Sequence, residues 1–297
     1  RLNMTNILRN KYLEVRIDHP LDNYQNARFD WTGKISEVKY LGKPLTITEK
    51  YDDQDENLFG RGLYNEFSID TALGFEDVEI GERFHKIGIG MLKKESSKYE
   101  FFKDYEIKPA VFDVLVEVDR VIIECISADA IGYAYHLRKQ IILTNDELII
   151  EYSLENTGKK EIKAEEYVHN FMSINNAVVN PNYLLKFPFH FQRNKSSQLV
   201  NPDGILEFLN DEVLFKGTTD NQFFANLLDG DRTVEAKWEL KNQNQKIGIS
   251  ETTSFSTNKI NLWGSKHVIS PELFYNIQIK PGEIEEWTRT YHFFEIE

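Results

Sequence analysis

Residues 140–154 read QIILTNDELIIEYSL, and the pattern of this stretch decides the fold class. In its second half, apolar side chains occupy every second position from Leu148 to Leu154, with polar side chains between most of them. A period of two is typical of a strand with one buried face. The Thr-Asn-Asp of residues 144–146 is typical of a turn, and the run Gln140 to Leu143 precedes it. The stretch therefore predicts an antiparallel β-hairpin.

Similar alternation recurs along the whole chain and predicts roughly fifteen strands. No segment repeats apolar residues at helical spacing over a dozen positions, so parallel sheets built from βαβ units are not expected. Linkers, repeats and low-complexity tracts are absent from the sequence. We therefore predict an all-β fold, a large antiparallel β-sandwich, formed as a single domain by residues 1–297. Further strands are expected at residues 12–17, 35–40, 99–107, 111–118, 120–126, 164–171, 184–191, 233–240, 259–263, 273–279 and 287–294.

Three segments lack this alternation and are the most irregular in the chain: residues 51–60, 196–204 and 215–231. Sandwiches commonly carry binding residues on loops held by a rigid scaffold. We expect these three segments to be loops over a binding face.

The charge balance argues against two classes of partner. The chain has 48 acidic and 35 basic residues and a net charge of −13. It contains no run rich in Lys and Arg that could follow a phosphate backbone or bind anionic lipid. We therefore expect neither nucleic acid nor a membrane as a partner.

The single cysteine, Cys125, lies in the apolar run 121–126 and is expected to be a small buried hydrophobic residue. One cysteine allows no intramolecular disulfide, which fits a reducing compartment. No stretch of about 18 apolar residues exists, and residues 1–10 are too polar for the core of a signal peptide. We expect a cytoplasmic protein.

His169 is the first candidate for chemistry. On the expected strand 164–171, alternation places it on the same face as Tyr167 and Phe171, between two aromatic rings. A histidine in such a place is often part of the core. Imidazole can also hold and release a proton near neutral pH, so a general acid is the alternative. A suitable partner would favour the second interpretation.

Glu272 is the second candidate. It follows Pro271 and precedes the expected strand 273–279, and proline is tolerated at the first residue of a strand. Glu272 is therefore expected at the mouth of a strand, where it is either a solvated surface residue or part of a ligand site. Trp263, nine residues upstream, could provide a stacking platform for a sugar ring.

Several segments together resemble the galactose mutarotase-like (aldose 1-epimerase) superfamily. They are Tyr-Val-His-Asn-Phe at 167–171, Trp263, Pro271-Glu272, Lys-Pro-Gly-Glu at 280–283, Trp-Thr-Arg-Thr-Tyr at 287–291 and Phe-Asp-Trp-Thr-Gly-Lys-Ile at 29–35. The resemblance implies a β-supersandwich with a wide cleft, no metal and no cofactor. It implies that His169 is the acid that protonates the ring oxygen of the sugar, and that Glu272 is the base that takes the anomeric proton. Tyr167 and Trp263 would be aromatic walls that orient the ring.

Two further residues are carried over although the motif differs there. The family places a second histidine against the sugar in an Asn-Gly…His-Gly-Gly segment, and the nearest counterpart is residues 83–90, with His85 as a substrate contact. Gly60-Arg61-Gly62 resembles the place where the family grips sugar hydroxyls with an arginine, which makes Arg61 a substrate contact. An exposed loop histidine and a surface turn arginine are the alternatives.

The resemblance implies an aldose 1-epimerase that interconverts the α and β anomers of a hexose, with the monosaccharide as its partner and a monomer or homodimer as its state. Three alternatives stay open. One is a carbohydrate-binding sandwich without activity, and another is a lyase or hydrolase on the same architecture. The third is a hexose-6-phosphate mutarotase, for which Arg61, Arg83 and Lys86 are the available cations.

Overall fold

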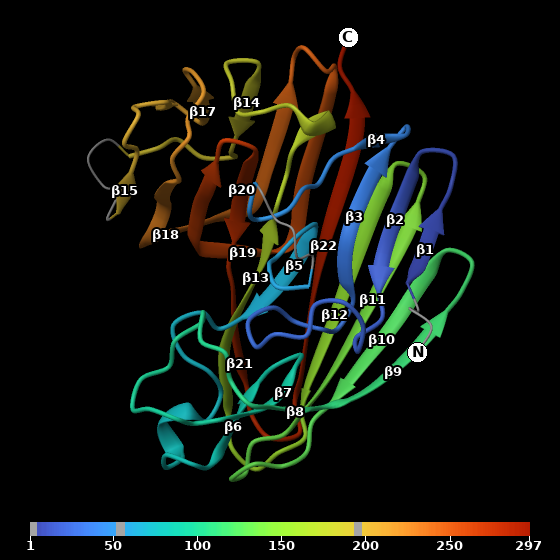
Figure 1. Ribbon diagram of the computed structural model, residues 1–297, viewed down its shortest axis with the longest axis vertical. Helices are drawn as coiled ribbons and strands as arrows, with labels where there is room; N and C mark the ends of the chain where they lie inside the picture. The colour runs from blue at the N-terminus through green and yellow to red at the C-terminus, as the bar shows by residue number, and fades with distance from the viewer. Residues whose placement is uncertain (1–4, 52–56, 193–197) are drawn as a thin grey trace.

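The computed structural model describes residues 5–51, 57–192 and 198–297, and its regular structure is almost entirely β (Figure 1). These ranges contain 22 strands, no α-helix, and two short 3₁₀ helices, η1 (Phe75–Asp77) and η2 (Ile174–Asn176). Every strand pairing between named strands is antiparallel. The predicted all-β antiparallel sandwich is confirmed.

The first large sheet has seven strands and supplies one wall of the sandwich. Its strands run in the order β1-β2-β3-β5-β13-β21, and β4 pairs with β3. Their bounds are β1 (Asn6–Arg9), β2 (Leu13–Asp18), β3 (Lys34–Tyr40), β4 (Lys43–Pro44), β5 (Leu63–Phe67), β13 (Ile162–Asn170) and β21 (Tyr275–Ile279).

The second large sheet has twelve strands, in the order β16-β17-β14-β18-β19-β22-β12-β11-β10-β9, with β15 on β18 and β20 on β19. Its two longest strands, β18 and β19, form one long hairpin. The bounds are β9 (Val111–Val116), β10 (Arg120–Ile126), β11 (Tyr135–Thr144), β12 (Glu147–Asn156), β14 (Tyr183–Lys186), β15 (Leu199–Val200), β16 (Leu206–Leu209), β17 (Glu212–Phe215), β18 (Phe223–Asn242), β19 (Ile247–Ser265), β20 (Val268–Leu273) and β22 (Ile284–Glu295).

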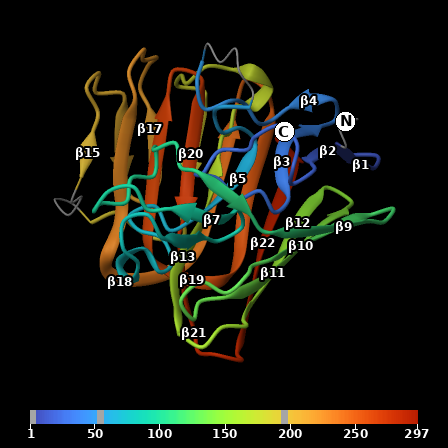
Figure 2. The same cartoon turned by 60° about the horizontal axis from the view of Figure 1, so that its bottom comes forward.

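A third sheet of three short strands lies across the lower end of the sandwich in Figure 1 and comes forward in Figure 2. It consists of β6 (Arg83–Lys86), β7 (Gly90–Lys93) and β8 (Ile107–Pro109). A second, mainly aromatic cluster packs around it, with Trp31, Phe84 and Phe171 among its buried members. The segment between β7 and β8 contributes residues 101–104 to the lining of the cavity described below.

The main apolar core lies between the two large sheets and draws side chains from both. The hairpin predicted from residues 140–154 is formed by β11 and β12, and Leu148, Ile150 and Leu154 are fully buried in this core. Cys125 is also fully buried, as predicted, and burial raises the pKa of its thiol to about 12. Period-two alternation therefore identified the core faces correctly.

Several predicted boundaries are wrong. Residues 99–106 are turns and loop, because Tyr99 and Tyr105 are buried by stacking on each other instead of by pairing in a sheet. Strand β14 ends at Lys186, and the aromatic residues that follow it cluster around a non-strand segment. Within the predicted loop 215–231, β18 begins at Phe223. Of the other two predicted loops, residues 52–56 and 196–197 lie outside the described residues.

Two glycines allow a matched test of backbone packing. Gly62 has a φ of +60°, and a Cβ there would lie 2.1 Å from the carbonyl oxygen of Ile35. Gly42 has a φ of +78°, but its Cβ would meet nothing within 4 Å. Gly42→Ala should lower the free energy of unfolding by about 1–2 kcal/mol, the cost of a left-handed backbone. Gly62→Ala should lower the free energy of unfolding, measured by urea titration, clearly more than Gly42→Ala does, because of the added backbone clash. Equal losses of free energy in the two variants would contradict this account.

Candidate active site

A cavity of about 890 Å³ is lined by residues of both large sheets and of the loops around them. This volume is within the range of roughly 300–1,000 Å³ that is common for small-molecule sites. Described parts of all three predicted loop segments line it, including Phe59, Gln198 and Gln222. Four of the residues proposed from the sequence also line it: Tyr167, His169, Trp263 and Glu272.

Strand β13 presents His169 to the cavity among aromatic rings. The ring centroid of His169 lies 4.5 Å from that of Tyr167 and 5.5 Å from that of Phe171, so the predicted aromatic neighbours are present. Phe29 adds a third ring, edge-on at 5.0 Å. His169 is only 5% exposed. These rings fix the orientation of the imidazole and exclude water from most of its surface.

A carboxylate faces each nitrogen of the His169 ring. Nε2 lies 2.9 Å from Glu66 Oε1, and Nδ1 lies 3.7 Å from Glu272 Oε2. The first distance is a hydrogen bond, whereas the second is too long for one. Since the ionised Glu66 carboxylate accepts a hydrogen bond from Nε2–H, the neutral ring has its lone pair on Nδ1, the nitrogen nearer Glu272. The structure thus brings His169 and Glu272 together although 103 positions separate them in the sequence.

Glu66 was not found by sequence analysis, and it connects the charged groups of the site. It is fully buried in β5, opposite Tyr167 of β13, whose hydroxyl donates a hydrogen bond of 2.7 Å to it. Arg28 Nε lies 3.2 Å from Glu66 Oε1, and Lys86 Nζ lies 3.5 Å from Oε2. A buried carboxylate needs such partners to remain ionised.

The environment of the three ionisable groups sets their charge. Burial alone would raise the pKa of Glu66, but Arg28, Lys86 and the hydrogen bond from His169 outweigh it and hold that pKa well below its usual range. Burial lowers the pKa of His169, against the opposing hydrogen bond with Glu66. Burial raises the pKa of Glu272 to about 8. At neutral pH, Glu66 is therefore ionised, His169 is neutral and Glu272 holds a proton.

This protonation state differs in one respect from the roles that the resemblance implied. The acid was expected to be His169 and the base Glu272, whereas the resting protein keeps the proton on Glu272. The two groups together hold one proton. Because they interact closely, their titration belongs to the pair and not to either residue alone.

A row of polar side chains continues from Glu272 across the sheet. Glu272 of β20 pairs with Asn261 of β19, which pairs with Asn226 of β18, and all three line the cavity. Within the described part of the chain, Asn261 Oδ1 is buried without a hydrogen-bond partner. Such an atom is costly unless a ligand or water satisfies it. Two residues further along the same strands, Trp263 of β19 pairs with Phe224 of β18, and both line the cavity. This part of the cavity wall therefore combines hydrogen-bonding groups with an aromatic surface.

Glu272 itself lies inside a strand, which corrects the expected strand mouth. Strand β20 ends at Leu273, and β21 begins at Tyr275 after a break at Phe274. Pro271 is tolerated within β20 because proline has no backbone N–H group that would need a hydrogen-bond partner in the sheet.

Arg61 does not line the cavity, contrary to the expectation for a substrate contact. It forms an isolated β-bridge with Thr48. The flanking glycines serve packing and not ligand approach: a Cβ at Gly60 would lie 2.7 Å from the Phe171 ring, and one at Gly62 would meet the backbone of β3. The cavity's arginine is Arg28, which the sequence analysis did not single out.

His85 also lies away from the cavity. It is completely buried, and its Nε2 lies 2.7 Å from the carbonyl oxygen of Tyr133. Its neighbour in β6, Lys86, points to the opposite face and reaches Glu66, because successive side chains of a strand alternate. The segment therefore reaches the candidate site through the Lys86–Glu66 ion pair and not through His85.

Within residues 5–51, 57–192 and 198–297, no group of three or more His, Cys, Asp or Glu side chains is arranged to hold a metal ion. The same part of the chain contains no helix long and apolar enough to cross a membrane.

The raised pKa of Glu272 predicts how its replacement changes stability. Between pH 4.5, the ordinary pKa, and about pH 8, the folded protein retains a proton that the unfolded chain has released. Stability must therefore fall as the pH rises through this window. The glutamine of Glu272→Gln cannot ionise, so the variant lacks this loss of stability. In scanning calorimetry, the Tm of the variant minus the Tm of wild type should therefore increase as the pH rises from 4.5 to about 8. Glu283→Gln, in an exposed turn, is the matched control and should show no such trend.

The sequence matches no protein-family model and no curated protein. Solved structures do match. A protein from Escherichia coli K12, provisionally named an aldose 1-epimerase, superposes with a TM-score of 0.65 at 11% identity, over 99% of each chain. The Slr1438 protein from Synechocystis sp. PCC 6803 gives a TM-score of 0.63 at 11% identity, over 100% of this chain and 97% of that one.

A galactose mutarotase-like protein from Lactobacillus casei gives a TM-score of 0.59 at 13% identity, over 98% of this chain and 100% of that one. The likeness spans the full described architecture, but identities this low establish a fold and not a reaction. The chain therefore has the galactose mutarotase-like fold.

Proposed function

We propose that this protein is an aldose 1-epimerase-like enzyme that interconverts the α and β anomers of a neutral hexose. The observation that supports this most strongly is the 3.7 Å separation of His169 Nδ1 and Glu272 Oε2 inside the cavity. The anomeric hydroxyl oxygen O1 and the ring oxygen O5 of a sugar are bonded to the same carbon. Two neighbouring proton-transfer groups can therefore reach both oxygens at once, as this reaction requires.

The reaction needs one proton donor and one proton acceptor. The acceptor takes the proton from O1, the C1–O5 bond breaks as the C1–O1 double bond forms, and the donor protonates O5. After rotation about the C1–C2 bond, the reverse transfers close the ring on the other face of C1. The number of protons on the His169–Glu272 pair is the same before and after, so a pair that holds one proton is sufficient.

The reactive form in this proposal has the proton on His169, with Glu272 ionised. It has the same proton count and net charge as the resting form. Glu66 favours it, because its carboxylate, 2.9 Å from Nε2, stabilises the imidazolium. Binding of the sugar favours it as well, since O1–H would donate a hydrogen bond to the Glu272 carboxylate and thereby compensate for its burial.

Recognition of a sugar fits the other cavity residues. Trp263 presents an aromatic surface, and the partnerless Oδ1 of Asn261 is suited to accept a hydrogen bond from a sugar hydroxyl. The Tyr167 hydroxyl is already bound to Glu66, and its ring stacks on Phe274 at 4.2 Å. Tyr167 would therefore act as a wall and as a support for Glu66, and not as a donor to the sugar.

The cavity's charges favour a neutral sugar over a sugar phosphate. Arg61, Arg83 and Lys86 do not line it. Among the described residues, the cationic side chains that line it are Arg28, Lys50, Lys103 and Lys259, and three of these are already paired with carboxylates: Arg28 with Glu49 and Glu66, Lys103 with Glu95, and Lys259 with Glu165. To bind any of these three, a phosphate would have to compete with the carboxylate partners.

Replacing either member of the pair should slow the reaction without abolishing binding. His169→Asn and Glu272→Gln should each lower kcat for anomerisation of freshly dissolved α-glucose or α-galactose by roughly 100-fold or more, because each removes a proton-transfer group. Sugar affinity should stay within a few-fold, since Trp263 and Asn261 are retained. Polarimetry measures the rate, and titration calorimetry measures the affinity.

His292→Asn is the matched control for the histidine variant. His292 lies in β22 with its side chain 42% exposed, paired with Asp146 outside the cavity, so its loss should leave kcat unchanged. Sugar binding with no acceleration by the wild type would favour the carbohydrate-binding alternative. Release of product from an oligosaccharide would favour a hydrolase or lyase.

The rate should depend on pH through the single shared proton. Activity should fall at low pH as the pair gains a second proton, at a value below the ordinary histidine pKa because burial disfavours imidazolium. It should fall again at high pH, near 8, as the pair loses its last proton. A bell-shaped profile of kcat/KM would agree with this mechanism. A value of kcat/KM that stays the same over the whole pH range would contradict it.

A further inference from the structure

Two side chains hold the backbone on either side of Glu272. The carbonyl oxygen of Pro271 accepts a hydrogen bond of 2.7 Å from Asn170 Nδ2. The carbonyl oxygen of Leu273 accepts one of 2.9 Å from Arg289 Nη2. Pro271 and Leu273 are the residues immediately before and after Glu272, and all four participating residues are buried.

These contacts replace a main-chain ladder. One edge of β20 pairs with β19 over its whole length. On the other edge, the main-chain hydrogen bonds among the described residues join Ile269 to Met172 alone, at 3.0 and 3.2 Å. Further along this edge Pro271 has no N–H group, so a regular pairing with β13 could not continue. From this point the position of β20 relative to β13 depends on side chains.

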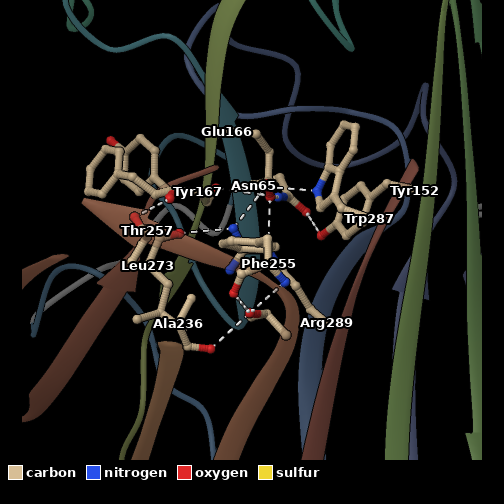
Figure 3. A network of polar contacts seen from close by, with 12 residues as sticks. Asn65, Tyr152, Glu166, Tyr167, Ala236, Phe255, Thr257, Leu273, Trp287 and Arg289 are labelled. Atoms are coloured by element: carbon tan, nitrogen blue, oxygen red, sulfur yellow. Dashed lines mark hydrogen bonds and ion pairs between the residues drawn. The ribbon is translucent and has the colours of Figure 1, made fainter. Parts of the chain in front are cut away.

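Both side chains belong to a buried ionic network on the core side of β13, and Figure 3 shows the part of it in which Arg289 lies beside Glu166 and Trp287. Arg289 lies between two carboxylates, 2.8 Å from Glu166 and 2.8 Å from Glu251. Asn170 Nδ2 also donates to Glu251 Oε1 at 3.0 Å. The indole N–H of Trp287 donates to Glu166. The network therefore holds Asn170 and Arg289 in single orientations.

The network links the two halves of the proposed catalytic pair. Asn170 follows His169 in β13, so one side chain faces the core while the other faces the cavity. β13 belongs to the seven-stranded sheet, and β20, which carries Glu272, belongs to the twelve-stranded sheet. The contact from Asn170 to Pro271 thus joins the sheets at the position where His169 and Glu272 meet.

We propose that Asn170 and Arg289 are positioning residues, which hold β20 against β13 and thereby keep the Glu272 carboxyl beside His169. The proposal rests on the proposed function in so far as the pair is catalytic. Arg289 uses its planar fork for this, since it donates to two carboxylates and to a carbonyl group. Lysine cannot reproduce that geometry.

The first experiment measures catalysis. Asn170→Ala and Arg289→Lys should each lower kcat for anomerisation by roughly 10- to 100-fold, because small displacements of a catalytic group have effects of this size. KM should change only a few-fold. Tyr152→Phe is the control: the Tyr152 hydroxyl donates to Asn65 in the same network at 2.8 Å but does not contact β20. It should lower Tm and leave kcat within two-fold. Equal effects of all three variants on kcat would overturn the proposal.

The second experiment is independent of turnover. Carbon-13 NMR of labelled glutamate carboxyls, assigned with Glu272→Gln, would follow the titration of Glu272 in wild type, in Arg289→Lys and in the milder Asn170→Ser. Displacement of β20 should expose the carboxyl to water and move its pKa down towards the ordinary value. The charged and titratable groups facing Glu272 are unchanged in these variants: Arg28, Glu49, Glu66, His169 and Lys259.

The two experiments separate the two proposals. If the wild type does not accelerate anomerisation, the proposed function fails, and the positioning role is decided by NMR alone. An unchanged Glu272 titration in folded Asn170→Ser and Arg289→Lys would overturn the positioning role. A lowered pKa in both, with an unchanged pKa in Tyr152→Phe, would support it.

Discussion

The burial of Arg289 between Glu166 and Glu251 is the interaction on which the junction of the two large sheets depends. All three side chains have no exposed surface. Removing three charges from water is expensive, and their attraction compensates only when the remaining donors and acceptors are also satisfied. Here Trp287 and Trp238 donate to the two carboxylates. Such a cluster has few alternative arrangements, so it fixes the relative position of the strands that carry it.

β13 connects this cluster with the cavity. Its alternate side chains give Tyr167 and His169 to the cavity and Glu166 and Asn170 to the core. The same division applies to β5, where Glu66 bonds the cavity residue His169 while Asn65 bonds Glu166 from the core side. Charged and polar groups thus lie on both faces of two central strands. The candidate site and the core are therefore mechanically continuous and not separate parts of the fold.

The sequence alone predicted the architecture well because most strands obey period-two alternation, as the hairpin at residues 140–154 illustrates. It also indicated His169, Tyr167, Trp263 and Glu272, which all line one cavity, although their roles remain proposals. The alternation was visible in each strand separately, whereas the contact between β13 and β20, made by the Asn170 side chain and the Pro271 carbonyl group, is a long-range contact that no local pattern encodes.

The residues that were missed share a physical reason. β5, Leu63–Phe67, is buried on both faces and contains Glu66, so it has neither alternation nor an apolar face for a pattern to detect. A buried carboxylate is recognisable only when its partners are known, and Arg28 and Lys86 come from distant segments. The choice of His85 over Lys86 was an error of one residue, which on a strand selects the opposite face.

The electrostatics of the pair explain why so much of the structure supports it. Burial favours the neutral form of Glu272, whereas the proposed reaction uses its ionised form beside an imidazolium. Without support, an ionised Glu272 side chain would move towards water and displace β20. The contacts of Asn170 and Arg289 with β20 prevent this movement. The charge of Glu272 is then stabilised by His169 and by the hydroxyl of a sugar instead of by solvent. A site of this kind requires a rigid core behind it, because the group that it positions is one that the protein interior disfavours.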